Sequence, residues 1–174
     1  MEYKLTGDNT KKSNMIFREE IEKIIKEEHV ERTRFHEFSK YKYNEIIHKF
    51  YYFFCDYKQF SATKVTLSYR RLHFRSTLDY YVVAGLNEKN WNWEEYLSTI
   101  NSSLPTNVEQ KLFLLLEEGW VYEGYADEIF LILKKLDFHI NFFVLSNRFD
   151  WFIAHDYIDE CAWMYCRSKS TDRH

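Results

Sequence analysis

Glycine and proline are scarce in this chain of 174 residues, which contains four glycines and one proline. None of the glycines lies in a G-x-G-x-x-G or G-x-x-x-x-G-K pattern, the kinds of loop that hold nucleotide phosphates. The sequence therefore excludes the usual classes of nucleotide-dependent enzyme. We expect no cofactor and no catalytic residues.

Cysteine is also rare. Cys55, Cys161 and Cys166 form an odd set without a paired framework, which predicts free thiols in a reducing cytosol. Paired C-x-x-C elements typical of zinc sites are absent. If Cys161 and Cys166 lie on one strand, their odd spacing points them to opposite faces, so we expect no metal site.

Long apolar runs are missing as well. Uninterrupted runs such as Phe142–Leu145 are only a few residues long, whereas a helix that spans a bilayer needs about 20. Residues 1–12 contain no apolar stretch of the kind found in signal peptides. The length predicts one domain over residues 1–174, with residues 1–12 and 167–174 as flexible ends. Together with the unpaired cysteines, the lack of a signal-like segment predicts a cytoplasmic protein.

Aromatic residues, in contrast, are abundant: the chain has 15 Phe, 14 Tyr and 5 Trp, which together make up 20% of it. This exceeds what a core of this size normally needs. Tyr and Trp are enriched at the energetic hot spots of protein interfaces. We expect most of these rings to fill the core and the remainder to serve as contact residues at the surface.

Charge is distributed unevenly along the chain. Residues 1–90 contain 17 Lys and Arg against 13 Asp and Glu, a balance of +4, whereas residues 91–166 contain 4 against 13, a balance of −9. An acidic surface of this kind attracts a basic partner and repels a nucleic-acid backbone. The alternative is an acidic surface that is merely solvated.

Apolar spacing and capping signals predict five helices. They are expected at Asn14–His29, after Ser39, from Asn92 with Glu95 as its capping-box partner, from Thr106 to Gly119, and at Ala126–Leu136. The fourth combines a capping box, Thr106 with Glu109, with a C-terminal glycine. Its inward-facing residues are Val108, Leu112, Leu115 and Leu116.

Strand signals are concentrated later in the chain. They lie at residues 62–84, where Val65, Leu67 and Tyr69 alternate and Tyr80–Val83 favours a strand, at Trp120–Glu123, in a hairpin formed by Ile140–Leu145 and Asp150–His155, and at Cys161–Cys166. The predicted fold is α+β, with several amphipathic helices packed against a small, mostly antiparallel C-terminal sheet formed largely by residues 119–166.

Two polar stretches suggest chemistry. The stretch from His155 to Glu160 places an imidazole beside carboxylates, which would suit a small hydrolase, but side chains this close in sequence also form turns or a surface for a partner. A second stretch combines cations and rings as in single-stranded nucleic-acid binding, although a pI near 6.2 favours internal pairing of its cations. Its members are Tyr57, Lys58, Phe60, Lys64, Tyr69, Arg70, Arg71, His73, Phe74 and Arg75.

The order of motifs between residues 118 and 161 resembles a known kind of protein. The motifs are Trp120–Gly124, a helix starting Asp127-Glu128-Ile129, Phe142–Ser146 ending in Leu-Ser, Phe149–Ile153 with its Phe-Asp-Trp step, and His155-Asp156. This order is similar to the immunity proteins of bacterial polymorphic toxins, including those of contact-dependent growth inhibition systems. The chain departs from that pattern at Tyr157-Ile158, where a more compact acidic turn is expected, and its N-terminal helices match nothing in it.

The resemblance implies that the protein binds and neutralises a cognate toxin domain, commonly a nuclease, in the cytoplasm. Such a role requires a rigid surface with complementary charge and aromatic anchors rather than catalysis. We expect the C-terminal domain of the toxin, as a basic partner, to contact exposed carboxylates and tyrosines of the acidic half. The candidates are Glu117, Glu118, Tyr122, Glu123, Tyr125, Asp127, Glu128, Asp156, Tyr157, Asp159 and Glu160.

Overall fold

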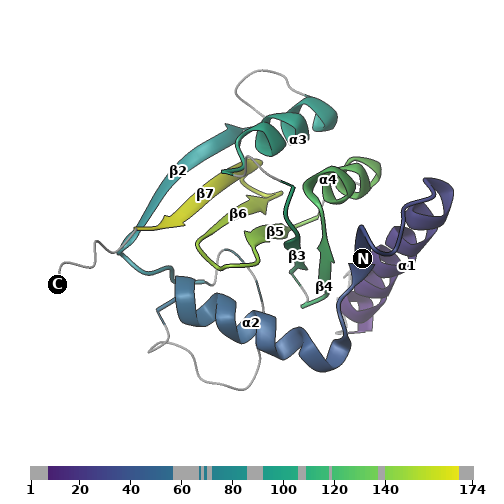
Figure 1. Cartoon of the computed structure of the whole chain (residues 1–174), viewed down its shortest axis with the longest axis horizontal. Helices are drawn as coiled ribbons and strands as arrows, with labels where there is room; N and C mark the ends of the chain where they lie inside the picture. Colours follow the sequence, from purple (N-terminus) through teal and green to yellow (C-terminus); the bar gives the residue numbers. More distant parts are fainter. Residues whose placement is uncertain are drawn as a thin grey trace, which may run out of the picture.

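A computed structural model of the chain describes residues 8–56, 67, 69, 72–85, 92–105, 109–117, 119–136 and 140–168, with the backbone alone for residues 8–16. These residues form a seven-stranded sheet in the order β1-β4-β3-β5-β6-β7-β2, and every neighbouring pair is antiparallel (Figure 1). The strands are β1 (Phe35–Glu37), β2 (Leu78–Gly85), β3 (Leu112–Leu116), β4 (Val121–Gly124), β5 (Phe142–Ser146), β6 (Trp151–Asp156) and β7 (Cys161–Arg167).

The α+β class is confirmed, but the sheet is neither small nor confined to the C-terminal part of the chain. Both of its edge strands, β1 and β2, come from the first 85 residues. β1 is only three residues long, too short to produce a period-two pattern in the sequence.

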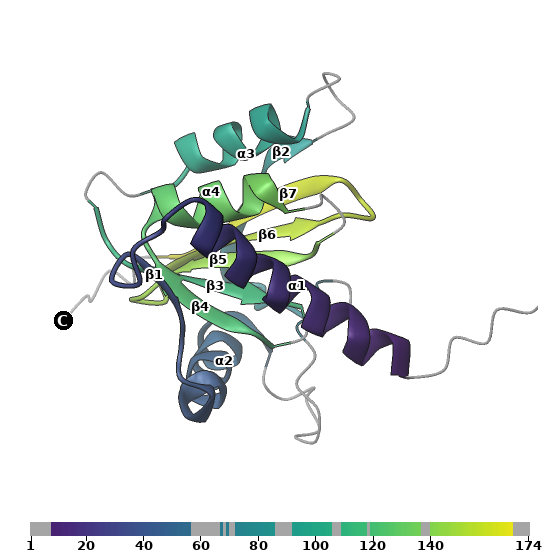
Figure 2. The same cartoon turned by 90° about the vertical axis from the view of Figure 1, so that its right-hand side faces the viewer.

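Helices cover both faces of the sheet (Figure 2). On one face lie α1 (Asp8–Glu27), α3 (Trp93–Ser102) and α4 (Ala126–Lys135), and on the other lies α2 (Lys40–Phe54). Side chains of each central strand alternate between two hydrophobic cores: Leu112 and Leu114 pack towards α1, α3 and α4, whereas Phe113 and Leu115 pack towards α2.

The predicted helix from Thr106 to Gly119 is wrong in its central part, because residues 112–116 form β3. All five side chains of this Leu-Phe-Leu-Leu-Leu run are buried. A strand covered by helices on both faces needs apolar residues at every position, and such a run also satisfies helical spacing over so short a length. Thr106 lies outside the described residues, and Gly119 (φ 91°) occupies the turn between β3 and β4.

The other predicted helices are confirmed as α1, α2, α3 and α4. At the start of α3, the side chain of Asn92 accepts a hydrogen bond from the backbone N–H of Glu95, and Glu95 accepts one from Asn92 in return. Ser39 is the N-cap of α2, but its side chain makes no capping hydrogen bond. α1 begins at Asp8, inside the segment predicted as a flexible end.

The hairpin predicted around residues 146–148 is confirmed as β5 and β6, and the third strand as β7. Tyr80–Val83 lies within β2. Leu67 and Tyr69 are not part of a strand, and residues 62–66 lie outside the described part of the chain. All three cysteines are free, and burial raises the pKa of the Cys55 thiol to about 12. Among the helices that the structure describes, none is long and apolar enough to cross a bilayer.

Candidate functional site

Two of the predicted contact residues lie inside the fold. Tyr122 is fully buried, and its ring stacks on that of Phe35 with the centroids 5.3 Å apart. Asp156 is also buried, and its Oδ1 accepts hydrogen bonds from the backbone N–H groups of Ile158 (2.8 Å) and Asp159 (3.3 Å). A partner that docks on the surface does not reach either side chain.

Two further carboxylates of the predicted set are held in ion pairs within the protein. Glu123 lies 3.4 Å from the Nζ of Lys111. Glu128 forms a two-pronged pair with the guanidinium of Arg34, which also lies over the ring of Tyr125, 4.5 Å from its centroid. The Arg34 contacts fasten the start of α4 to the segment before β1, and the Lys111 pair joins β4 to the start of β3. We therefore assign Glu123, Tyr125 and Glu128 a structural role.

The remaining candidates do not form one surface. The register aligns Leu116 with Phe142, Phe142 with His155, and Asp156 with Cys161, so Glu117 and the turn after β6 lie at one end of the sheet. That group contains Glu117, Tyr157, Asp159 and Glu160. Asp127 follows β4 at the opposite end, where Leu112 pairs with Gly124. Glu118 lies outside the described residues.

The predicted His155 cluster is not an open catalytic arrangement. His155 is buried, and its Nδ1 lies 2.7 Å from the hydroxyl oxygen of Tyr96. Its ring also stacks on that of Phe142. Because Asp156 follows it directly in β6, the two side chains point to opposite faces of the sheet. The turn interpretation therefore holds for Asp156. Within the described residues, no group of His, Cys, Asp and Glu side chains is placed to hold a metal ion.

Most of the basic stretch falls outside the described residues, namely Tyr57, Lys58, Phe60, Lys64, Arg70 and Arg71. The two aromatic rings that are described are packed in the fold. Tyr69 stacks on Trp163 at 4.8 Å, and Phe74 lies 4.6 Å from Tyr165. Neither ring is free to stack on a base.

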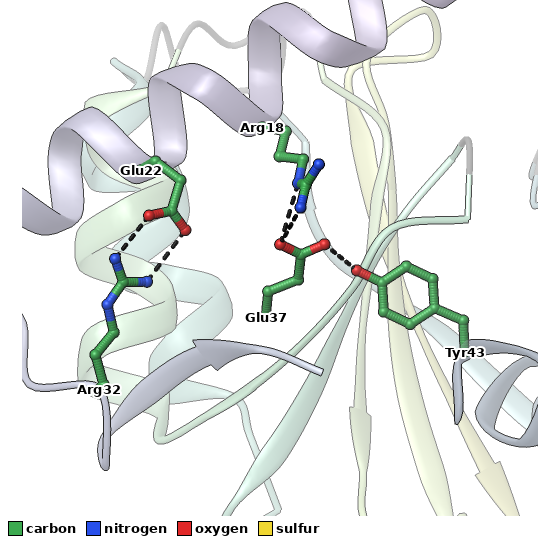
Figure 3. A network of polar contacts seen from close by, with 5 residues as sticks. All are labelled: Arg18, Glu22, Arg32, Glu37 and Tyr43. Carbon is green, nitrogen blue, oxygen red and sulfur yellow. Dashed lines mark hydrogen bonds and ion pairs between the residues drawn. The ribbon is translucent and has the colours of Figure 1, made fainter. Parts of the chain in front are cut away.

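A polar network that the sequence did not reveal lies between α1 and β1 (Figure 3). The Nε and Nη2 atoms of Arg18 donate to Oε2 of Glu37 at 3.0 and 2.9 Å, and the hydroxyl of Tyr43 donates to the other oxygen of Glu37. Beside it, Arg32 donates to both oxygens of Glu22. Residues so far apart in sequence form no motif, so only the fold brings them together.

This network lies beside a groove of about 480 Å³ lined by Arg18, Glu19, Glu22, Lys23, Lys26 and Glu37. Three cations face three carboxylates, and the innermost ones already pair with one another. Burial, followed by the hydrogen bond to Glu37, raises the pKa of Tyr43 well above its ordinary value. The arrangement ties α1 and α2 to the β1 edge of the sheet, and its inner charged side chains have their partners within the protein.

The opposite edge of the sheet is open. Within the described residues β2 pairs with β7 alone, so its other side has no neighbouring strand. Tyr80, Tyr81 and Val82 in its middle are 67%, 53% and 52% exposed. Tyr80 stacks on Tyr165, which belongs to the core on the α2 side, so Tyr81 points to the other face.

A groove of about 330 Å³ lies at the start of β2 and is lined by Tyr52, Phe53, Arg75, Thr77, Leu78, Arg167 and Ser168. Arg75 donates from Nε to the carbonyl of Cys55 (3.1 Å) and from Nη2 to that of Tyr52 (2.7 Å), which satisfies the C-terminal end of α2. The guanidinium of Arg167 lies over the ring of Phe53, 4.3 Å from its centroid. Among the described residues, neither arginine forms an ion pair.

We call β2 together with this groove the β2 surface. The sequence pointed to parts of it, since Tyr80–Val83 was predicted as a strand and Arg75 belonged to the basic stretch. It did not show that β2 is an edge strand, because that property depends on the strand order. Chemically, the β2 surface offers an outer strand edge with no paired strand among the described residues, exposed tyrosines and two guanidinium groups.

The fold and this surface define an α+β protein whose antiparallel sheet is covered by helices on both faces and is open along one edge. The chain belongs to the family of unknown function DUF6756, whose model matches residues 13–173. No curated protein and no solved structure shows significant similarity to it.

Proposed function

We propose that this protein acts by binding another protein along β2, and that the partner is the cognate toxin domain implied by the resemblance. The observation that carries this proposal is the eight-residue β2 edge strand with its exposed Tyr80, Tyr81 and Val82. In an edge strand, alternate N–H and C=O groups point outward and are available to a strand of another chain.

Edge strands of soluble proteins usually carry features that prevent such pairing, including lysines, prolines, or a covering helix or loop. β2 has no lysine or proline, and Asp79 is its only charged residue. Within the part of the chain that the structure describes, a bulge between Val82 and Ala84 is the one further protective feature along it. A long aromatic edge with so little protection is better explained by a partner that covers it than by permanent exposure to water.

The aromatic excess in the sequence supports the same proposal. Most of the rings that the structure describes pack in the two cores. Among the described residues, six large hydrophobic side chains are exposed: Tyr41, Tyr52, Tyr80, Tyr81, Val82 and Ile158. Four of these belong to β2 or to the adjoining groove. Exposed tyrosines concentrated in one place are typical of an interface.

Toxin neutralisation requires a rigid surface of this kind and no chemistry by the chain itself. The proposal moves the contact from the predicted acidic residues to the β2 surface, because those residues are buried, internally paired or divided between two ends of the sheet. That the acidic half of the chain attracts a basic toxin, and that the complex forms in the cytoplasm, stay predictions.

The experiment is a binding measurement with the C-terminal domain of the toxin encoded next to this gene. We expect a tight complex with the full chain, and co-expression should protect cells from the toxin. Tyr81→Lys should weaken the complex by about thirtyfold, the effect of removing a hot-spot side chain. The matched control is Tyr41→Lys, because Tyr41 is 98% exposed on α2 and lies outside the β2 surface.

The proposal fails if no adjacent toxin domain binds and its toxicity is unchanged by co-expression. It also fails if Tyr41→Lys weakens the complex as much as Tyr81→Lys does, because binding would then not depend on β2. Circular dichroism of both variants checks that each remains folded.

A further inference from the structure

We propose that the groove at the start of β2 binds a carboxylate side chain of the partner, carried on an extended segment that pairs with β2. The inference rests on the proposed function, since it names the chemistry of the partner at the same surface. Its recognition elements are the guanidinium groups of Arg75 and Arg167, and β2 supplies the backbone pairing.

Both guanidinium groups are held in place by the fold. The Nε and Nη2 atoms of Arg75 donate hydrogen bonds to the carbonyls of Cys55 and Tyr52, respectively. Its Nη1 makes no hydrogen bond within the described part of the chain. Arg167 is anchored through its backbone N–H, which donates to the carbonyl of Asp150 at 2.9 Å, and through the ring of Phe53. Guanidinium groups fixed in this way are well suited to receive a carboxylate.

Arg167 carries a polar atom that the described residues leave unsatisfied. Its Nε is buried and has no hydrogen-bond partner among the residues that the structure describes. Buried donors in native proteins are almost always hydrogen-bonded. The Nε is closed off in this conformation, so a carboxylate in the groove satisfies this donor only once the Arg167 side chain turns towards it.

Among the described residues Arg75 and Arg167 have no carboxylate partner, which sets them apart from the arginines near the β1 edge. There, Arg18 pairs with Glu37, Arg32 with Glu22, and Arg34 with Glu128. Asp79 and Asp150 are exposed carboxylates in the region of the groove, yet neither forms an ion pair with Arg75 or Arg167 in the described structure. The described residues that line the groove thus include two cations, two aromatic rings and no carboxylate.

The position of the groove favours an acidic protein segment over nucleic acid. Thr77 and Leu78 line it, so a strand paired with β2 passes directly from Tyr80 and Val82 into the groove. Its volume of about 330 Å³ is small for a run of stacked nucleotides. Asp79 lies on the same path and repels a phosphate backbone. We therefore expect an acidic residue near one end of an otherwise apolar extended segment, with no carboxylate opposite Asp79.

The test is a selection of short random peptides, displayed on phage, against the full-length chain. Selected peptides should be rich in β-favouring residues and carry Asp or Glu at one fixed position, and nuclear magnetic resonance should show that they shift the backbone amides of β2. Replacing that acid by its amide should weaken binding about tenfold, and Arg167→Gln should do the same. Lys26→Gln removes an exposed cation of α1 as the matched control and should have no effect.

Arg167→Lys keeps the positive charge but removes the planar fork, and it should recover only part of the lost affinity if the carboxylate contact is two-pronged. If Arg167→Gln proves unstable to heating, Arg167→Lys takes its place in the binding measurement. The inference is overturned if the peptides show no fixed acid, or if neither Arg167 variant changes their affinity. It is equally overturned if single-stranded RNA of mixed sequence competes with the peptides and depends on Arg167.

These outcomes separate the inference from the proposed function. If the toxin domain binds through Tyr81 while the peptides show no acid and Arg167→Gln has no effect, the proposed function stands and the inference falls. If acid-bearing peptides bind β2 but no adjacent toxin domain does, the groove is confirmed as an acidic-strand site and the toxin assignment falls.

Discussion

The two edges of the sheet are built in opposite ways. At one edge, β1 has three residues, α1 packs beside it, and Glu37 of β1 holds both Arg18 of α1 and Tyr43 of α2. At the other edge, β2 has eight residues and exposes Tyr80 and Tyr81 to water. A sheet that does not close needs protection at both ends. Among the described residues β2 has less of it than β1, and this difference supports the proposal that a partner covers β2.

We call the β1 edge the closed edge and the β2 edge the open edge. The largest difference between them is expected when a side chain is added at Gly124 of β4, next to the closed edge. A Cβ added to Gly124 would lie 2.7 Å from Cδ2 of Phe35 and 2.8 Å from the carbonyl oxygen of Arg34. Because one of these atoms belongs to the backbone, β1 has to move away. We expect Gly124→Ala to lower the free energy of unfolding by about 1–3 kcal/mol, measured by urea denaturation.

The counterpart at the open edge is Tyr81→Ala. Since Tyr81 is 53% exposed and no strand of the described residues lies on its outer side, we expect a loss below about 1 kcal/mol. Equal losses for Gly124→Ala and Tyr81→Ala would show that the two edges do not differ in how they support the fold.

The second prediction concerns the network at the closed edge. Glu37→Gln removes the ion pair with Arg18 and weakens the hydrogen bond from Tyr43, so we expect a loss of about 1–2 kcal/mol in the free energy of unfolding. The matched control is Glu45→Gln, whose pair with Lys49 is exposed on α2 and should contribute at most about 0.5 kcal/mol.

A double-mutant cycle of Glu37→Gln with Tyr43→Phe isolates the coupling between the two side chains. If the two changes are additive, the hydrogen bond between them contributes nothing to the closed edge, and the contrast with β2 depends on packing alone.

The sequence predicted the elements whose patterns are local. The capping box of Asn92 and Glu95 marked the start of α3, and polar residues between two apolar runs marked the hairpin of β5 and β6. β3 was mistaken for a helix because the signals at Thr106, Glu109 and Gly119 enclose a run whose apolar spacing fits either structure. The choice between helix and strand depends on the helices that cover both faces of the sheet. Those helices come from distant parts of the chain, so no local pattern shows that β3 is buried on both faces.

The candidate site was less predictable than the fold, for the same reason. Carboxylates such as Glu128 looked available in the sequence, but Arg34 lies 94 residues away and neutralises it in the fold. Part of the negative charge of the C-terminal half is therefore neutralised by basic residues of the same protein. The exposure of Tyr80 and Tyr81 follows from the place of β2 in the strand order, which no local pattern encodes.

The smallest expected effect lies at the open edge and uses Cys166 as a probe. Cys166 of β7 is paired with Asp79 of β2 in the register. Burial raises the pKa of the Cys166 thiol, and the carboxylates of Asp150 and Asp79 raise that pKa further by disfavouring the thiolate. Asp79→Asn removes one negative charge, so the pKa should fall, and the thiolate fraction near pH 8 should rise.

Because the thiolate is the reactive form, iodoacetamide should modify Cys166 faster in Asp79→Asn, by about twofold, since solvent screens charges at an open edge. Mass spectrometry of timed reactions between pH 7 and 9 measures the rate at this cysteine alone. Asp127→Asn, at the start of α4, serves as the control and should leave the rate unchanged. An unchanged or slower rate in Asp79→Asn would contradict the register of β2 on β7. In the wild type, a peptide bound along β2 should slow the modification of Cys166 because it covers this edge.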